Sequence, residues 1–376
     1  MEYTRREFGK TALASLPAVA LVGHPISAFA QAKPNSTING VRIGTITYSY
    51  RSMPDQSAEA TLKYIVDSGI SQVELMGGPV SDYAMKRTGF KPAAGGGRGG
   101  GGGGGGRGRG GPDPATLTAT WNGVKCAPGQ PGTDPEMGTQ PLPAGGRGGR
   151  RGGEPPTPEQ IAAAEAERKW RLGLSMDIFK DLRKMYNDAG VSIYAVKDVR
   201  QGSDEELEYT FAVAQALGAD HITLELPSGP NAVATLKRLG DWGVRKKINV
   251  AYHTHAQGSM TAFDQAFAIS PANMANVDLG HFVAGGNRGG TPLDFLNKYH
   301  GRISSYHLKD RTTPANCSLN LAWGTGETPV KEILQLVRKN KWTMPASIEL
   351  EYNVPEGSDA VKEVRKCVEF CRAALA

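Results

Sequence analysis

Histidine and carboxylate side chains gather at the ends of four apolar runs in the second half of the chain. His253 and His255 end one run, Asp278 and His281 the next, His307 and Lys309 the third, and Glu349 and Glu351 the last. Imidazole nitrogens and carboxylate oxygens bind divalent metal ions, and the same groups act as general acids and bases. In a (β/α) barrel, the carboxyl ends of separate strands bring such side chains to one mouth. The residues therefore indicate a metal-dependent enzyme.

Hydrophobic patterning predicts eight repeats of a strand followed by a helix. The strands are expected at 41–47, 71–76, 191–197, 220–226, 248–254, 274–279, 302–308 and 346–352. The helices are expected at 57–68, 157–189, 204–217, 229–243, 259–268, 291–299, 327–339 and 357–374. Hydroxyl residues such as Thr157 and Ser203 precede acidic first turns, which is typical of helix starts. Eight such repeats predict a single closed (β/α)8 barrel, the TIM-barrel fold, in place of an open doubly wound sheet.

The polar residues share one parity along these predicted strands. Glu74, Lys197 and Glu225 on the second, third and fourth strands have the same phase as the later histidines and carboxylates. Side chains two residues apart point to the same face of a strand, so all of these groups are expected to converge inside the barrel mouth. Burying them without partners would cost several kcal/mol each, about what an unpaired polar group loses on leaving water. The pattern thus favours a shared ion or a dense polar network.

The chain opens with paired arginines, Arg5 and Arg6, followed by a modestly apolar stretch over 11–23 and the small-residue pattern Ala28-Phe29-Ala30. This arrangement resembles a twin-arginine (Tat) export signal, which carries folded proteins. The apolar stretch is too short to span a bilayer, for which roughly 20 residues are needed. We therefore expect 1–30 to be a signal peptide. The remainder, 31–376, is then a periplasmic or secreted barrel with no membrane segment in its mature form.

Residues 91–154 have a low-complexity composition rich in glycine and arginine. With few apolar residues to bury, the segment is predicted to be a disordered insertion after the second strand, in a loop on the catalytic face. It carries +4 of the chain's formal net charge of +6, and the signal carries +1, so the folded body is nearly neutral. Aromatic residues are almost absent from the segment and export removes the usual partner, which argues against nucleic-acid binding.

Other motifs exclude further classes of protein. No G-x-G-x-x-G sequence follows the first predicted strand, so neither dinucleotide nor P-loop chemistry is supported. Four cysteines are too few for a disulfide framework, and all four are interpreted as structural residues. Cys367 and Cys371 lie four apart on the predicted last helix, a spacing typical of a buried stripe.

Three motifs carry a resemblance to a known family. They are Val277-Asp278-Leu279-Gly280-His281, Tyr306-His307-Leu308-Lys309-Asp310 and Ser347-Ile348-Glu349. They are similar to the D-x-x-H, H-x-K-D and terminal-strand glutamate of the sugar phosphate isomerase/epimerase superfamily, whose fold is the xylose isomerase-like TIM barrel. The resemblance covers roughly 41–374 apart from the insertion. It implies that Asp278, His307 and Glu349 bind one divalent ion, which could be Mn²⁺, Mg²⁺, Zn²⁺, Co²⁺ or Fe²⁺.

The chain departs from the family at the fifth strand, where His253 replaces the usual glutamate. We expect His253 to be the fourth ligand, which removes one negative charge and favours borderline metals. The substitution also removes a carboxylate base, and Glu225 on the preceding strand is a candidate for either role. His255 is a second candidate base, or else a residue that orients His253.

The family reaction implies proton abstraction next to a carbonyl, with the ion stabilising an enediolate. Its outcome is isomerisation, epimerisation or, when a substituent leaves, elimination. The candidate catalytic residues are Glu225, His255, His281 and Lys309, the last pairing with a substrate oxygen. Glu74, Lys197 and Glu351 are expected to contact the substrate. We expect this partner to be a small non-phosphorylated keto-sugar or sugar derivative.

Two other functions stay open at this level. One is a non-catalytic sugar-binding barrel, and the other is a metal-dependent hydrolase similar to endonuclease IV. The hydrolase would need further metal ligands and a basic face for DNA, and the sequence shows neither. The sequence also leaves open the stereocentre, the native metal and whether several copies of the chain assemble.

Overall fold

Eight parallel strands close into a barrel in the computed structural model, which describes residues 33–92, 119–121, 124–126 and 156–376. In barrel order they are β2 (Val41–Ile46), β3 (Gln72–Met76), β6 (Ser192–Lys197), β7 (His221–Glu225), β8 (Asn249–His253), β9 (Asn273–Asp278), β10 (Ile303–Leu308) and β13 (Ala346–Ile348). The barrel closes because β2 pairs with both of its neighbours: Thr45 lies opposite Ile348 of β13, and Ile46 lies opposite Glu74 of β3. The predicted (β/α)8 barrel is confirmed.

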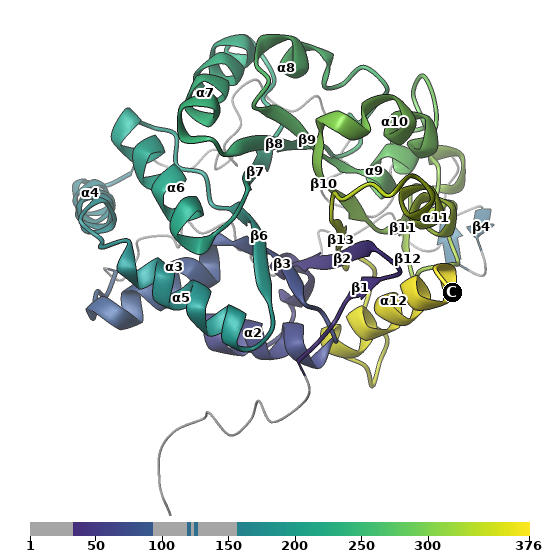
Figure 1. Ribbon diagram of the computed structural model, residues 1–376, viewed down its shortest axis with the longest axis horizontal. Helices are drawn as coiled ribbons and strands as arrows, with labels where there is room; N and C mark the ends of the chain where they lie inside the picture. Colours follow the sequence, from purple (N-terminus) through teal and green to yellow (C-terminus); the bar gives the residue numbers. More distant parts are fainter. Residues whose placement is uncertain (1–32, 93–118, 122–123, 127–155) are drawn as a thin grey trace, which may run out of the picture. The chain divides into compact units, whose positions relative to one another are not determined.

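Helices surround the strands as an outer ring (Figure 1). They are α2 (Ala58–Asp67), α5 (Asp177–Asp188), α6 (Asp204–Leu217), α7 (Ala232–Lys246), α8 (Asp264–Ile269), α10 (Pro292–Tyr299), α11 (Val330–Asn340) and α12 (Ala360–Ala374). Ser203 caps α6 by accepting the backbone N–H of Glu206, as its position in the sequence predicts. Ser57, Thr291 and Asp359 cap α2, α10 and α12 in the same way, whereas α5, α7, α8 and α11 begin without a side-chain cap.

Several elements differ from the sequence-based expectation. The single helix expected over 157–189 is two helices, α4 (Pro158–Leu172) and α5, which separate after the C-cap residue Gly173. An unexpected helix, α3 (Gly77–Thr88), follows β3 without a loop. The insertion was expected to leave directly from the loop after this strand, but α3 lies between the strand and residue 91. A short helix, α9 (Leu279–Ala284), also follows β9 at once.

Short strands complete the structure. β1 (Thr37–Ile38) pairs antiparallel with β2, and β11 (Asp310–Arg311) pairs with β12 (Asn320–Leu321). Within the predicted disordered segment, β4 (Ala119–Trp121) and β5 (Val124–Cys126) form an antiparallel pair. The rest of that segment from residue 93 to 155, and the predicted export signal, lie outside the described residues.

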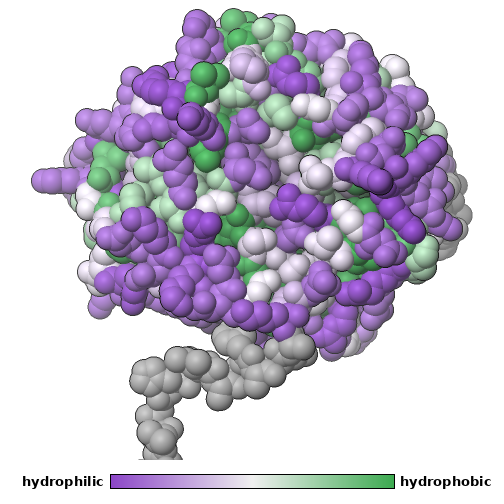
Figure 2. Space-filling model, viewed as in Figure 1, coloured by the Kyte–Doolittle hydropathy of each residue, from purple (hydrophilic) through white to green (hydrophobic). Residues whose placement is uncertain are grey.

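Apolar side chains fill the layer between strands and helices. Residues that alternate with the polar ones, such as Tyr252, Val277 and Tyr306, are fully buried there. Hydrophobic residues are scattered in small groups on the face seen in Figure 2, and hydrophilic ones cover most of its rim. None of the described helices has the length and apolar character needed to cross a membrane.

The cysteines differ from the sequence-based reading in one respect. Cys367 and Cys371 are free and buried in α12, as their spacing predicts. Cys317, in contrast, is disulfide-bonded. A structural bridge thus exists although the cysteine count gave no sign of a framework.

Candidate metal centre

The predicted site residues lie at the carboxyl ends of the barrel strands. Glu74 lies on β3, Lys197 ends β6, Glu225 ends β7, His253 ends β8, Asp278 ends β9 and His307 lies near the end of β10, while Glu349 and Glu351 follow β13 directly. Register places His307 opposite Asp278 on the neighbouring strand. Since residues of one parity face the barrel interior, side chains from strands far apart in the sequence meet there.

His253, Asp278, His307 and Glu349 form a buried cluster. Each residue offers one ring nitrogen or carboxylate oxygen, and these four atoms lie within 4.8 Å of one another. His307 Nδ1 is 2.8 Å from Glu349 Oε2 and 3.9 Å from Asp278 Oδ2. No member of the cluster is more than 5% exposed. The structure therefore brings together the four residues predicted as metal ligands.

The chemistry of the cluster fits a divalent ion. Asp278 Oδ1 accepts the backbone N–H of His281 at 2.7 Å and so caps α9, whereas Oδ2 is buried and lies 3.0 Å from the ammonium of Lys309. Two imidazole nitrogens with two carboxylate oxygens suit borderline metals such as Zn²⁺, Mn²⁺, Co²⁺ and Fe²⁺.

Glu74 lies beneath His307 and is fully buried. Its Oε2 is 2.8 Å from His307 Nε2, and its Oε1 accepts a hydrogen bond from Thr223 at 2.6 Å. Burial alone would raise the pKa of Glu74, but the charge of His307 outweighs it and lowers the pKa to about 2. Burial likewise would lower the pKa of His307, but Glu74 and Glu349 raise it to about 10. Glu74, predicted to contact substrate, is thus placed where a carboxylate orients a ligating histidine.

Lys309 is a buried ammonium held by carboxylates. Its Nζ lies 2.6 Å from Glu351 Oε2, 2.8 Å from Glu349 Oε2 and 3.0 Å from Asp278 Oδ2. Burial would lower the pKa of Lys309, but the three carboxylates hold it well above the usual value. The side chain is therefore a permanent cation, which can donate a hydrogen bond to a substrate oxygen but cannot act as a base near neutral pH.

His281 is buried between two cations. Lys309 Nζ lies 2.9 Å from its Nε2, and Arg311 NH1 lies 2.6 Å from its Nδ1. Burial and these two charges hold the pKa of His281 well below its usual value, so the ring is neutral. His281 also lies near His253 and His255 in a second group of potential ligands. Because both of its nitrogens already face cations, His281 is poorly placed to bind a second ion.

Glu225, Lys197 and His255 lie at the more open end of the site. Lys197 Nζ is 3.1 Å from Glu225 Oε1, and His255 Nε2 is 3.8 Å from Glu225 Oε2. Removal from water would raise the pKa of Glu225, but Lys197 and the nearby histidines outweigh this and lower it to about 2. The Glu225 side chain is 53% exposed and is paired with Lys197, so the carboxylate is ionised. These residues can reach a substrate entering from solvent.

Several residues of the site were not predicted from the sequence. Asn276 and Ser305 are fully buried next to the cluster, Thr223 holds Glu74, and Arg311 holds His281. The first three share the parity of the predicted residues, since Asn276, Ser305 and Thr223 come two positions before Asp278, His307 and Glu225. That phase could have identified them, and Arg311, two positions after Lys309, continues the same phase beyond the strand.

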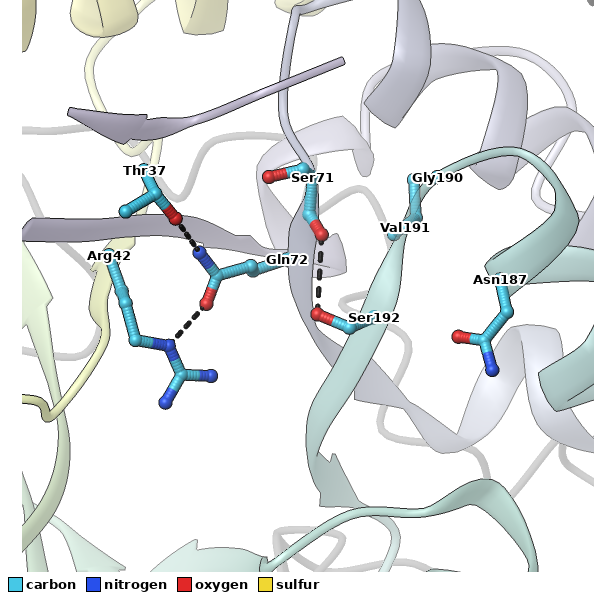
Figure 3. Close-up of a pocket in the computed structure, with 8 residues that line it drawn as sticks. All are labelled: Thr37, Arg42, Ser71, Gln72, Asn187, Gly190, Val191 and Ser192. Carbon is cyan, nitrogen blue, oxygen red and sulfur yellow. Dashed lines mark hydrogen bonds between the residues drawn. The ribbon is translucent and has the colours of Figure 1, made fainter. Parts of the chain in front are cut away.

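One pocket of the described residues lies elsewhere on the barrel. It has a volume of about 640 Å³, and Figure 3 shows the residues that line it: Thr37, Arg42, Ser71, Gln72, Asn187, Gly190, Val191 and Ser192. These residues lie at or before the first residues of β2, β3 and β6, at the amino ends of the strands. Arg42 donates a hydrogen bond to Gln72, which in turn donates to Thr37. Barrel enzymes act at the opposite, carboxyl end, so this pocket is not the chemical site.

Comparison with solved structures identifies the architecture. A sugar phosphate isomerase/epimerase from Parabacteroides distasonis superposes with a TM-score of 0.51 at 15% identity, covering 96% of this chain and 99% of that one. The probable 3-DHS dehydratase AsbF from Bacillus anthracis gives a TM-score of 0.50 at 12% identity, covering 88% and 98%. The shared fold is the (β/α)8 barrel. An L-ribulose 3-epimerase gives 0.47 at 12% identity, covering 89% and 94%.

At these identities the likeness concerns the fold. No protein-family model and no curated protein matches the sequence.

Proposed function

We propose that the protein is a divalent-metal-dependent isomerase or epimerase, or a lyase of the same chemistry, acting on a non-phosphorylated keto-sugar or sugar derivative. The buried cluster of His253, Asp278, His307 and Glu349 carries the proposal, because its four potential ligands come from neighbouring strands at the catalytic end of the barrel. A purely sugar-binding barrel would have no need to bury two histidines and two carboxylates with a lysine among them.

A bound ion would polarise a substrate carbonyl and so acidify the adjacent carbon. The chain supplies the groups that move the proton. Glu225 is ionised and half exposed, and His255 lies 3.8 Å from it with a quarter of its side chain exposed. Either can accept a proton from a substrate carbon at the mouth, and general bases of this kind contribute about 10²- to 10⁴-fold. Lys309 would donate a hydrogen bond to a substrate oxygen only after releasing one of the three carboxylates that hold it.

The pairing of the cations supports a neutral substrate. Lys197 is paired with Glu225, Lys309 with three carboxylates, and Arg311 with His281. A phosphate needs cations that can turn to it, and each of these would have to leave an existing partner first. Hydroxyl groups of a sugar can instead share the existing carboxylates and histidines through hydrogen bonds.

The isomerase and lyase outcomes share their first step. Structures of the same fold are named as a sugar phosphate isomerase/epimerase and as a probable dehydratase. In both reaction types a proton leaves a carbon next to a carbonyl, and the outcome depends on whether that proton returns or a neighbouring group leaves. The identity of the substrate decides between them.

We also propose that the mature protein works in the periplasm or outside the cell. The paired arginines near the N-terminus motivate this proposal. The disulfide at Cys317 supports it, because such bonds persist in oxidising compartments. A fusion of residues 1–32 to a reporter, with Arg5 and Arg6 both changed to lysine as the control, tests it by cell fractionation. A reporter that stays cytoplasmic with the native arginines would contradict it.

Metal analysis and solvent exchange test the enzymatic proposal together. We expect one divalent ion per purified chain, and we expect keto-sugars incubated with the protein in deuterated water to gain deuterium at one carbon. Asp278→Asn should lose the ion and the exchange, while His300→Ala, at an exposed histidine stacked on Trp342, should keep both. A wild-type protein that takes up no divalent ion would refute the proposal.

A further inference from the structure

A chain of hydrogen bonds crosses the barrel interior from the surface to the metal cluster. It starts at Asp220, whose side chain is 67% exposed just before β7, and Asp220 is hydrogen-bonded to His221 Nδ1. His221 Nε2 is 2.8 Å from Ser305 Oγ, which is 2.6 Å from Asn276 Nδ2. Asn276 Oδ1 is 2.9 Å from His253 Nδ1. TIM-barrel interiors are usually filled by branched apolar side chains, so this polar line is unusual.

Strand register explains how these side chains meet. Asn276 of β9 lies opposite His253 of β8 on one side and Ser305 of β10 on the other. His221 begins β7, four residues before Glu225, so it lies about 13 Å below the mouth at the usual rise per residue. His221, Ser305 and Asn276 are fully buried, and His253 is 1% exposed. Water cannot reach these four side chains, so they satisfy one another's hydrogen-bonding groups in its place.

The polarity of the line is fixed at Asn276. Its Nδ2 also lies 3.4 Å from Glu74 Oε2. An ionised carboxylate can only accept, so the amide NH2 group faces Glu74 and Ser305, and the amide oxygen faces His253. His253 Nδ1 must then carry a hydrogen, and Nε2 keeps its lone pair.

The remaining bonds follow in one direction. Ser305 accepts from Asn276, so its own hydrogen is free to be donated to His221 Nε2. His221 Nδ1 then donates to the carboxylate of Asp220. Every hydrogen in the line points away from the cluster and toward the surface carboxylate. Hydrogen bonds that share one direction polarise one another and strengthen cooperatively.

We infer that Asn276, supported by Ser305, His221 and Asp220, is a positioning residue that fixes the tautomer of His253 and presents Nε2 to the metal cluster. A carboxylate ligand at this position would need no such device, because either of its oxygens can bind. An imidazole binds through one nitrogen only, and the hydrogen bond at its other nitrogen decides which one. The line of hydrogen bonds through the barrel thus explains how a histidine at position 253 can present one defined nitrogen as a ligand.

The inference deepens the proposed metal function, and its test separates the two. Histidines are labelled with ¹⁵N in the full-length protein, and the N–H coupling pattern of each ring reports its tautomer. With seven histidines in the chain, single substitutions assign the signals. In protein treated with a chelator, we expect His253 to show the Nδ1–H tautomer. In Asn276→Leu we expect a mixture of tautomers, and Zn²⁺ affinity about 10- to 100-fold weaker than wild type, the usual effect of losing a ligand-orienting group.

Asn273→Leu is the matched control. Asn273 is also a fully buried asparagine of β9, but its side chain faces the helices and hydrogen-bonds Tyr252, Leu236 and Ala266. Its loss should cost stability without changing the His253 tautomer or Zn²⁺ affinity. Ser305→Ala is a milder variant that breaks the line one bond further away, and we expect a smaller loss of affinity than in Asn276→Leu.

Each outcome decides one of the two proposals. Wild-type tautomer and wild-type Zn²⁺ affinity in Asn276→Leu would overturn the inference. If Asn276→Leu does not fold, the same result in Ser305→Ala overturns it. A wild-type protein that binds no Zn²⁺ refutes the metal function, and the tautomer of His253 in that protein still decides the positioning role.

Discussion

Gly280 allows the metal motif to pack against the neighbouring strand, and its replacement by alanine should disturb both stability and the site. Gly280 is the second residue of α9, immediately beside Lys309 after β10. A Cβ atom at this position would lie 2.3 Å from Lys309 Cγ and 2.6 Å from the Lys309 carbonyl oxygen. The second contact is with backbone, so it cannot be relieved by a side-chain rotation.

The magnitude follows from two opposing effects. Adding a methyl group to a packed interior typically costs about 1–3 kcal/mol. Alanine in place of glycine within a helix returns up to about 1 kcal/mol. At contacts this short the steric cost should prevail, leaving a net loss of about 1–2 kcal/mol and a fall in Tm of about 2–6 °C for a domain of this size. Relieving this steric clash must also move the backbone of Lys309, which lies two residues after the candidate ligand His307.

Gly301→Ala provides a matched comparison. Nothing lies within 4 Å of a Cβ at Gly301, which is exposed in the turn before β10. Thermal unfolding followed by circular dichroism and Zn²⁺ titration of the chelator-treated protein measure both effects. We expect Gly280→Ala to lose stability and Zn²⁺ affinity, and Gly301→Ala to retain both. Equal Tm values and equal Zn²⁺ affinities in the two variants would refute the claim that Gly280 is needed for close packing against Lys309.

Four further predictions test the site. Asp278→Asn should keep the cap on α9, because asparagine also caps helices well, yet its metal content by mass spectrometry should fall sharply; full occupancy would contradict a ligand role. Glu74 and Glu349 raise the pKa of His307 above its usual value to about 10, so ion binding must displace a proton, and calorimetry between pH 6 and 8 should show Zn²⁺ affinity rising by about tenfold per pH unit. In the chelator-treated protein the ion pairs of His307 with Glu74 and Glu349 stabilise the fold fully below pH about 6.5 and lose this effect as the pH rises through 10. A Tm that does not fall as the pH rises through this range would count against these ion pairs. One of the two variants Glu225→Gln and His255→Gln should remove the base, and that variant should lose solvent deuterium exchange while the metal stays bound. If a labelled substrate instead keeps its own deuterium during turnover, the reaction is a hydride shift.

Strand parity was the strongest signal in the sequence. The phase shared by Glu74, Asp278 and His307 predicted that residues more than 200 positions apart would face one interior, and Glu74 and His307 are 2.8 Å apart. The repeat count predicted the closed barrel for a related reason, because alternating strands and helices of this length leave few other topologies. Both inferences depend on local periodicity, which a single sequence records directly.

Features that depend on tertiary contacts were not predictable in the same way. The sequence could not show that Glu74 lies beneath His307, out of reach of the mouth, because parity gives the face of a residue but not its depth. Helices α3 and α9 begin without a loop after their strands, and the turn signals that mark the other helices are missing there. Arg311 is fully buried although arginine is rarely so, and its contacts with His281 and with the Ser318 carbonyl explain the placement.

The charges of the buried cluster account for a histidine at position 253. The cluster and the residues around it hold four carboxylates, those of Glu74, Asp278, Glu349 and Glu351, and two permanent cations, Lys309 and Arg311. Burial and the nearby cations hold the pKa values of His253 and His281 well below their usual range, so both rings are neutral. With His307 also deprotonated as a ligand, the group carries a net charge of −2. A divalent ion balances that charge, whereas a glutamate at position 253 would leave an uncompensated negative charge inside the barrel, where it costs most.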